Sequence, residues 1–318
     1  MTDQDVVEFF GPLLLERKMD NVNIKLGRAM MLQQLAADSD DDDVTIPTTF
    51  HFIWLGVNEM PFKEAAESSN WNEPMISWKV QHEEFNITLW TDSNDAMYKQ
   101  WYNKRAFLYA MDHGMYGMAS DIMRLEILFK IGGVYVDIDY YCIDSIWDLL
   151  RGKDFVCGAS NTGCIELNNG FMAAISGHGV VKEMMESIHG WFDLYEAQSQ
   201  QMALTKSFLD ATTAAALDQA WQLSHNDIID QTGPGLLTRT ISSVLLTGEA
   251  TCTNTRRIAI LHHKVLHPVP NSVRGAAAKL AMDAYIVPGM TKAIHLWGCS
   301  WQNNHEESRG EKERANIL

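Results

Sequence analysis

The chain has 318 residues, of which 46% are apolar and 10% aromatic. This composition is typical of a globular protein, because a disordered chain carries far less apolar material. Lysine and arginine number 25 against 41 acidic residues, which gives a formal net charge of −16. The acid excess argues against general nucleic-acid binding, which needs a basic face to displace counterions, and against docking on anionic lipid.

No stretch of the sequence approaches the roughly 20 apolar residues of a membrane-spanning helix. The first ten residues, MTDQDVVEFF, carry acids where a signal peptide carries lysine or arginine. The five cysteines never form a C-x-x-C pair, which is typical of reduced thiols and not of a disulfide framework or a zinc ribbon. We therefore expect a cytoplasmic protein with no membrane span.

The N-terminal segment differs in character from the rest. Residues 5–37 have apolar residues at roughly helical spacing, and an acidic run over 38–43 follows them. Blocks of like charge repel one another and are typical of linkers. We expect residues 1–45 to form a helical extension with an acidic linker, and the core over 46–318 to fold without residues 1–37.

From residue 49 to residue 139, strand-like and helix-like segments alternate. Apolar runs rich in β-formers predict strands over 49–56, 87–92 and 134–139, and helical patterns cover 94–112 and 118–131. Such alternation predicts an α/β fold with a mostly parallel sheet, in which ligands bind beyond the carboxyl ends of the strands. Asp92, Asp137 and Asp139 lie at such ends.

The second half of the sequence is mixed. Short strands are predicted over 154–160 and 170–174, and the block from 180 to 229 is predicted to be helical throughout. A further helix follows from 233 to about 246, and short strands broken by proline are predicted over 258–270 and 284–297.

The pair Asp137 and Asp139 is the strongest chemical feature. Residues i and i+2 of a strand project to the same side, so the two carboxylates can share a hard cation such as Mg²⁺ or Mn²⁺. A solvated turn explains this pair alone equally well. The preceding helix places Asp121 and Arg124 on one face. A surface ion pair is the alternative for these two, but the short unit as a whole favours a site for a phosphorylated sugar.

This unit resembles the D-x-D sugar-binding region of retaining glycosyltransferases with the GT-A fold. The group includes yeast-type initiating mannosyltransferases, capsular-polysaccharide transferases and, more distantly, the large clostridial glucosylating toxins. The matching residues are Ser120, Asp121, Arg124, Leu128, Gly132, Gly133, Tyr135, Asp137 and Asp139. Segments at 52–54, 89–92, 169–174, 232–234 and 295–301 also match in order, although Gly179 stands where the family has proline. The resemblance covers about 46–301 and omits the helical block.

The resemblance implies a Rossmann-like GT-A domain, with a nucleotide-binding half over 46–145 and an acceptor half over 146–318 that carries a helical insertion at 180–230. Extra helices are expected at the N-terminus and in mid-chain. Mn²⁺ or Mg²⁺ is the implied cofactor. The implied catalytic residues are Asp121, Arg124, Asp137 and Asp139; the donor-binding residues are Trp54, Tyr135, Asn169 and Trp301; the metal ligands are Asp139, Asp137 and Ser300.

Several of these roles have alternatives. Trp54 and Tyr135 are equally consistent with an apolar core, and Asn168 competes with Asn169 for the donor sugar. His295 is either structural or a further metal ligand. Cys299 adjoins the C-terminal loop, but no base accompanies it, so packing is its expected role.

The implied activity is transfer of a sugar from a nucleotide-sugar donor, with UDP favoured, to a glycan or small-molecule hydroxyl. A toxin-like enzyme that modifies a host protein, after non-classical delivery to the host cell, is an alternative. A phosphatase of the haloacid dehalogenase type is disfavoured, because its D-x-D usually opens the domain and Tyr141 stands where a small residue is usual. A non-catalytic binding protein is the remaining alternative.

Overall fold

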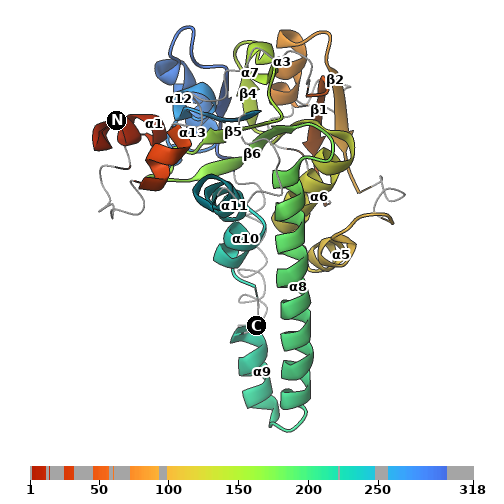
Figure 1. Ribbon diagram of the computed structural model, residues 1–318. Helices are drawn as coiled ribbons and strands as arrows, with labels where there is room; N and C mark the ends of the chain where they lie inside the picture. Colours follow the sequence, from red (N-terminus) through yellow and green to blue (C-terminus); the bar gives the residue numbers. More distant parts are fainter. Residues whose placement is uncertain are drawn as a thin grey trace.

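The computed structural model describes residues 2–11, 14, 25–31, 46–56, 60, 72–92, 99–220, 223–247 and 257–298. Its centre is a six-stranded sheet with the order β2-β1-β3-β6-β5-β7 (Figure 1). The strands are β1 (Thr49–Ile53), β2 (Asn86–Trp90), β3 (Gly133–Val136), β5 (Phe155–Ala159), β6 (Leu167–Ala174) and β7 (Ile258–Leu261). A two-stranded antiparallel sheet joins β4 (Tyr140–Cys142) to β8 (Ala293–His295).

Strand direction confirms the predicted α/β fold. β1 is parallel to β2 and β3, β5 is parallel to β7, and β6 is antiparallel to both of its neighbours. The sheet is therefore mixed but mostly parallel, as expected. Because β1, β2 and β3 share one direction, their carboxyl ends meet at one edge, where the sequence places Asp92 and the D-x-D pair.

Helices cover both faces of the sheet, and each face has its own apolar cluster. One cluster gathers buried side chains of α1, α6, α8 and α11, and the other those of α3, α7 and α12. The helices are α1 (Asp3–Phe10), α3 (Glu73–Gln81), α5 (Lys104–Asp112), α6 (Tyr116–Ile131), α7 (Trp147–Leu150), α8 (Gly179–Lys206), α9 (Ala211–Ala220), α10 (His225–Gln231), α11 (Pro234–Thr247), α12 (His263–Leu266), α13 (Ala276–Ala281) and the 3₁₀ helix η3 (Met282–Tyr285).

Helix α6 leads directly into β3 and fixes the entry to the site. Gly132 ends α6 with φ +71°, and its N–H donates to the carbonyl of Leu128. A Cβ on Gly133 would lie 2.7 Å from the carbonyl oxygen of Thr49. Two glycines therefore allow the tight turn and the close approach of β3 to β1.

Three sequence-based element bounds need correction. The strand predicted over 134–139 ends at Val136, because residues 137–139 turn and the N–H of Tyr140 bonds the carbonyl of Asp137 at 3.2 Å. Of the helix expected over 94–112, residues 99–103 are not helical and α5 begins at Lys104, whereas residues 93–98 lie outside the described residues. The late segments contain more helix than expected, since α12 and η3 interrupt them.

Helix α1 is part of the core and not a detached extension. Val6 and Phe10 are fully buried, and a ring nitrogen of His263 lies 2.9 Å from the carbonyl of Phe9. This packing argues against the expectation that the core folds without residues 1–37, because removing α1 would expose apolar surface on the sheet layer. That expectation stays a prediction. The acidic run at 38–43 lies outside the described residues.

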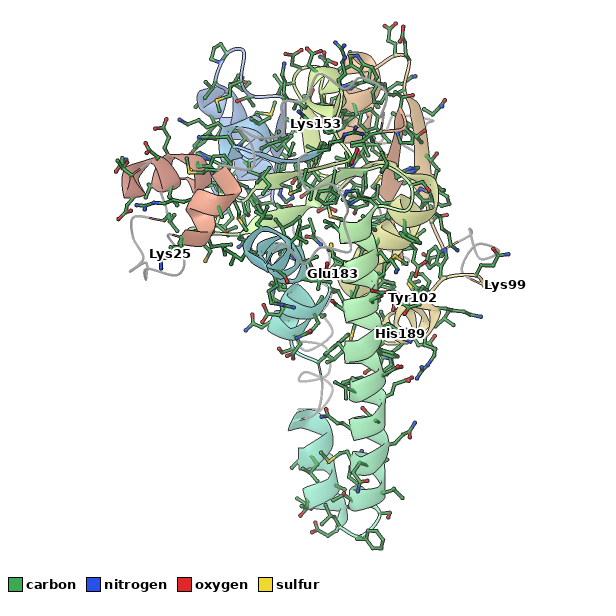
Figure 2. The ribbon with its side chains drawn as sticks, in the orientation of Figure 1. Lys25, Lys99, Tyr102, Lys153, Glu183 and His189 are labelled. Carbon is green, nitrogen blue, oxygen red and sulfur yellow. The ribbon has the colours of Figure 1, made fainter. Side chains whose placement is uncertain are left out.

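The helical block at 180–230 comprises α8, α9 and α10 and has breaks between them. The distal part of α8 pairs with α9 and extends away from the sheet (Figure 1). The buried residues of α8 all lie between Val180 and Phe192, and there the ring of His189 packs on that of Tyr102 with centroids 4.7 Å apart (Figure 2). Across the described ranges, no helix combines the length and the apolar character needed to cross a bilayer.

Candidate active site

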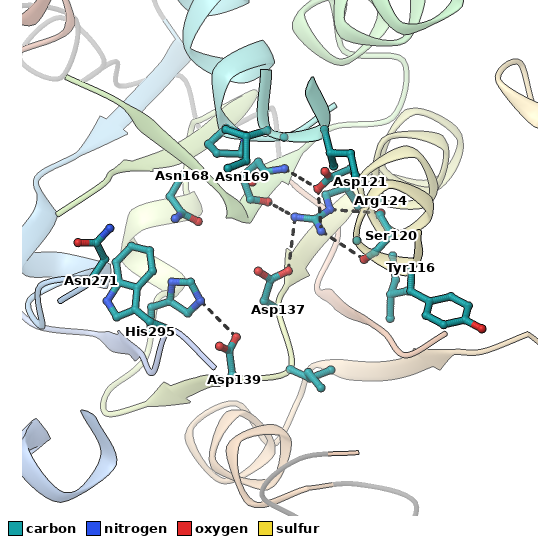
Figure 3. A pocket seen from close by; sticks show the side chains of 18 of the residues that line it. Tyr116, Ser120, Asp121, Arg124, Asp137, Asp139, Asn168, Asn169, Asn271 and His295 are labelled. Carbon is teal, nitrogen blue, oxygen red and sulfur yellow. Dashed lines mark hydrogen bonds and ion pairs between the residues drawn. The ribbon is translucent and has the colours of Figure 1, made fainter. Parts of the chain in front are cut away.

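A cavity of about 550 Å³ opens at the carboxyl ends of β1 and β3. Figure 3 shows its side chains, which come from distant parts of the sequence. Tyr116 lies at one end, Asp137 and Asp139 lie in the middle, and Asn271 lies at the other end. This volume falls in the range of ordinary small-molecule sites.

Arg124 is the centre of a buried polar network. Only 6% of its side chain is exposed; one guanidinium nitrogen lies 3.0 Å from Asp121 Oδ1, and the other lies 3.4 Å from Asp137 Oδ1. That second nitrogen also donates to the carbonyl of Asn169 at 2.8 Å. Burial opposes the charge, but the acidic groups around it outweigh burial and raise the pKa of the Arg124 guanidinium above its ordinary value.

Asp121 has partners on both carboxylate oxygens. Oδ1 accepts from the side-chain amide of Asn169 at 2.8 Å, and Oδ2 accepts from the hydroxyl of Thr232 at 3.0 Å. Burial raises the pKa of Asp121, and the charge of Arg124 opposes that rise. The predicted helix therefore does place Asp121 and Arg124 together, but as a buried pair and not as a surface pair.

The Asp137 carboxylate lies against Tyr135 and strand β6. The Tyr135 hydroxyl donates to Asp137 Oδ1 at 2.6 Å, and the Tyr135 ring lies 4.2 Å from the Arg124 guanidinium carbon. A Cβ on Gly170 would lie 2.5 Å from Asp137 Oδ2. Glycine at position 170 is therefore a condition for this placement of the carboxylate.

Asp139 is held from the opposite side of the cavity. Its Oδ1 lies 3.3 Å from His295 Nε2, and its Oδ2 accepts the N–H of Gly298 at 2.6 Å. The His295 ring stacks on Tyr140 at a centroid distance of 4.3 Å. Burial alone would raise the pKa of Asp139, but His295 and the Gly298 N–H outweigh burial and lower it, so this carboxylate is ionised at neutral pH.

Asp137, Asp139 and His295 together can hold a metal ion. One ligand atom from each of the three lies within 4.8 Å of the others. Adjacent ligands of an octahedral cation with bonds of 2.0–2.1 Å are about 3 Å apart, close to the distance between His295 Nε2 and Asp139 Oδ1. The two carboxylates are ligands that suit Mg²⁺ or Mn²⁺, so these residues fit the expected cofactor.

The opposite end of the cavity is apolar and aromatic. Trp54, directly after β1, and Tyr116, at the start of α6, both line it. Between them Gly56 has φ +90°, and a Cβ there would lie 2.7 Å from the Tyr116 ring. Its N–H donates to the Asp92 carboxylate at 3.1 Å, which ties the end of β1 to the end of β2.

The structure brings most of the residues that the sequence singles out into one cavity. Asp121, Arg124, Asp137, Asp139, Trp54, Tyr135 and Asn169 all line it, whereas Ser300 and Trp301 lie outside the described residues. Their individual roles stay predictions. Asn168 also lines the cavity; its Oδ1 accepts from the Tyr140 hydroxyl at 3.1 Å and from the N–H of Gly170 at 2.7 Å.

Some residues of the site had no assigned role at the sequence level. Thr232 belongs to the Thr-Gly-Pro segment that matches the family, and that match was its only signal. Tyr116 and Asn271 reach the cavity through packing of distant segments, and nothing in the local sequence marks them. His225 on α10 shows that the helical block outside the resemblance also contributes to the wall.

Part of the chain that forms this site matches a known protein family. Residues 68–156 match the model of the family described as "Glycosyltransferase sugar-binding region containing DXD motif". This matched segment, called the DXD region below, makes up less than half of the chain. This DXD region contains α6, the glycine turn, β3 and both D-x-D aspartates, so the resemblance that the sequence indicates is confirmed.

One curated protein is also similar to this chain in sequence. The chain is 26% identical over 153 residues to inositol phosphoceramide mannosyltransferase 3 of Schizosaccharomyces pombe. The match covers 46% of this chain and 38% of that protein, so the chain spans well under half of its relative.

Solved structures of toxin glycosyltransferases are also similar to the chain. The PaToxG glycosyltransferase aligns with a TM-score of 0.44 and 15% identity, covering 72% of this chain and 81% of that one. The UDP-bound glycosyltransferase domain of the YGT toxin aligns with a TM-score of 0.40 and 12% identity, covering 69% and 80%.

Proposed function

We propose that the protein is a metal-dependent retaining glycosyltransferase that uses a nucleotide-sugar donor, with a UDP-sugar favoured. The observation that carries the proposal is the convergence of Asp137, Asp139 and His295 within 4.8 Å, beside the buried Arg124. The two aspartates belong to the segment that matches the DXD sugar-binding family. Asp137, Asp139 and His295 would hold Mn²⁺ or Mg²⁺. A bound divalent cation acts as a Lewis acid on the departing diphosphate.

Other residues of the cavity would bind the nucleotide base and the sugar and would position Asp137. The aromatic end, with Trp54 and Tyr116, suits a nucleotide base, because bases stack on aromatic rings. The network around Arg124 fixes the position of Asp137 before any ligand arrives, which is the preorganisation that electrostatic catalysis requires. Asn168 and Asn169 offer amide groups to sugar hydroxyls.

Retention of the anomeric configuration is proposed from the family resemblance. The attack would then come from the same face as the departing diphosphate, which takes the proton of the acceptor. Both oxygens of Asp121 accept hydrogen bonds from protein groups, so this carboxylate is poorly placed to attack a sugar itself. That arrangement supports a direct transfer over a covalent intermediate on Asp121.

The proposed acceptor is a hydroxyl of a glycan or of a small molecule, such as the inositol group of a lipid. The curated relative is named for transfer to inositol phosphoceramide, which supports an acceptor of this kind. A toxin-like enzyme that modifies a protein side chain is the second candidate.

A screen of nucleotide sugars for hydrolysis in the presence of manganese tests the proposal. An aryl phosphate assayed in parallel distinguishes a phosphatase. We expect manganese-dependent release of nucleoside diphosphate from one donor and no aryl phosphatase activity. Aryl phosphate turnover without nucleotide-sugar turnover would contradict the proposal, as would binding of a nucleotide sugar with no hydrolysis and no transfer to any acceptor.

A further inference from the structure

Trp297 has an unusual backbone conformation next to the proposed metal site. Among the residues that the structure describes, it is the one non-glycine with a positive φ, at +53°. This left-handed region costs an ordinary side chain roughly 1–2 kcal/mol relative to glycine, and a bulky residue seldom occupies it. Such strain persists only where the surrounding structure enforces it, and it concentrates at functional sites.

The N–H groups on either side of Trp297 bond the same aspartate. The N–H of Leu296 bonds the main-chain oxygen of Asp139 at 3.0 Å, and the N–H of Gly298 bonds its carboxylate Oδ2 at 2.6 Å. The left-handed residue Trp297 lies between these two N–H groups, so its backbone conformation sets the direction of the Gly298 N–H relative to the bond made by Leu296.

The indole ring of Trp297 anchors this turn. Its Nε1 donates to the carbonyl of Val269 at 2.9 Å, and only 7% of the residue is exposed. The centroid of its ring lies 4.2 Å from that of the His295 ring, which also stacks on Tyr140. The same side chain therefore holds both the turn and the imidazole that contacts Asp139.

We infer that Trp297 is a positioning residue for the proposed metal site. Its left-handed backbone aims the Gly298 N–H at Asp139, and its buried ring holds that conformation and the orientation of His295. Asp139 Oδ1 and His295 Nε2 are thereby presented together toward the cavity. Groups that orient metal ligands in this way commonly change metal affinity 10- to 100-fold when they are lost. The inference rests on the proposed function, because it assumes that Asp139 and His295 bind a cation.

The test compares Trp297→Gly with Trp297→Ala, two variants that both lack the ring. Alanine ordinarily stabilises a chain relative to glycine, but only glycine adopts φ +53° without penalty. If the turn positions the ligands, the Ala variant should bind Mn²⁺ about five- to thirty-fold more weakly than the Gly variant, as measured by electron paramagnetic resonance of free Mn²⁺. Wild type should bind at least as tightly as the Gly variant.

Gly289→Ala is the matched control, since Gly289 has φ +75°, nothing lies within 4 Å of its Cβ position, and it does not line the cavity. It should lower the thermal midpoint but leave Mn²⁺ affinity unchanged. If Trp297→Ala does not fold, Trp297→Asn against Trp297→Thr repeats the comparison, because Asn tolerates the left-handed region and β-branched Thr does not. The inference would be overturned if both variants of a pair bound Mn²⁺ with equal affinity, or if the Ala or Thr variant bound it more tightly. Mn²⁺ binding by wild type would in that case still support the metal site. No binding by wild type would overturn both.

Discussion

Substitution of Gly170 by alanine tests whether the placement of Asp137 matters for catalysis. The φ of Gly170 is not in the left-handed region, so the backbone accepts alanine. The new Cβ would lie 2.5 Å from Asp137 Oδ2 and 2.8 Å from Asn168 Oδ1. The Asp137 carboxylate must retreat by about 1 Å to reach an ordinary contact distance. Its side chain is 30% exposed and can swing toward the cavity, so we expect a stability cost of only about 1 kcal/mol, at the low end for overpacking.

Activity should respond far more than stability. A displacement of about 1 Å at a catalytic group costs roughly 10²-fold in rate, so we expect kcat for nucleotide-sugar turnover to fall by about that factor. Steady-state kinetics and a thermal melt of the same preparation measure both quantities. Gly190→Ala is the matched control: nothing lies within 4 Å of the Cβ position in this α8 residue, so it should gain about 0.5–1 kcal/mol and keep full activity. A folded Gly170→Ala variant with wild-type kcat would refute the reasoning.

Three further predictions concern the rest of the molecule. Trp54→Ala should weaken nucleotide binding about ten-fold, since base stacking contributes roughly 1–3 kcal/mol; calorimetry that finds unchanged affinity would place the base elsewhere. Phe10→Ala should cost about 3–5 kcal/mol in urea unfolding, because Phe10 is fully buried, and a cost below about 1 kcal/mol would mean that α1 is dispensable. Burial lowers the pKa of His51 to about 4, against 6.5 in the unfolded chain. The unfolded chain then takes up a proton that the folded protein does not, so stability should fall as pH drops from 6.5 to 4, by up to about 3 kcal/mol. In urea melts at a series of pH values, His51→Gln should reduce the dependence of the unfolding free energy on pH. A pH dependence parallel to that of wild type would contradict the lowered pKa of His51.

The sequence predicts the local parts of the site well. Helix α6, the glycine turn and β3 follow from helical periodicity, glycine and β-formers within one continuous segment, and the family match covers the same segment. The D-x-D pair was expected on a strand but lies in a turn after Val136, because β4 leaves the main sheet to pair with β8. That pairing joins residues more than 150 positions apart, and no local pattern reports it.

The contacts that orient the site also lie beyond single-sequence reasoning. Thr232 reaches Asp121 across 111 residues, and His295 reaches Asp139 through the second sheet. The role of Gly170 depends on a side chain that approaches from β3, and the strain at Trp297 depends on its anchor at Val269. Helix α1 looked detachable because an acidic run follows the N-terminal helices, whereas its burial is decided by an apolar surface formed elsewhere in the chain.

The central claim is that Asp139 holds a divalent cation that the transfer reaction needs. The most direct measurement is nucleotide-sugar turnover by wild type and by Asp139→Asn, in chelator and after manganese is restored. We predict that chelator abolishes wild-type turnover, that manganese restores it, and that Asp139→Asn stays at least about 10²-fold slower at any manganese concentration. In thermal melts, manganese with nucleotide at a hundred times its Kd should stabilise wild type by about 2.7 kcal/mol and the variant far less. Full wild-type activity in chelator, or near-normal turnover by Asp139→Asn, would contradict the account.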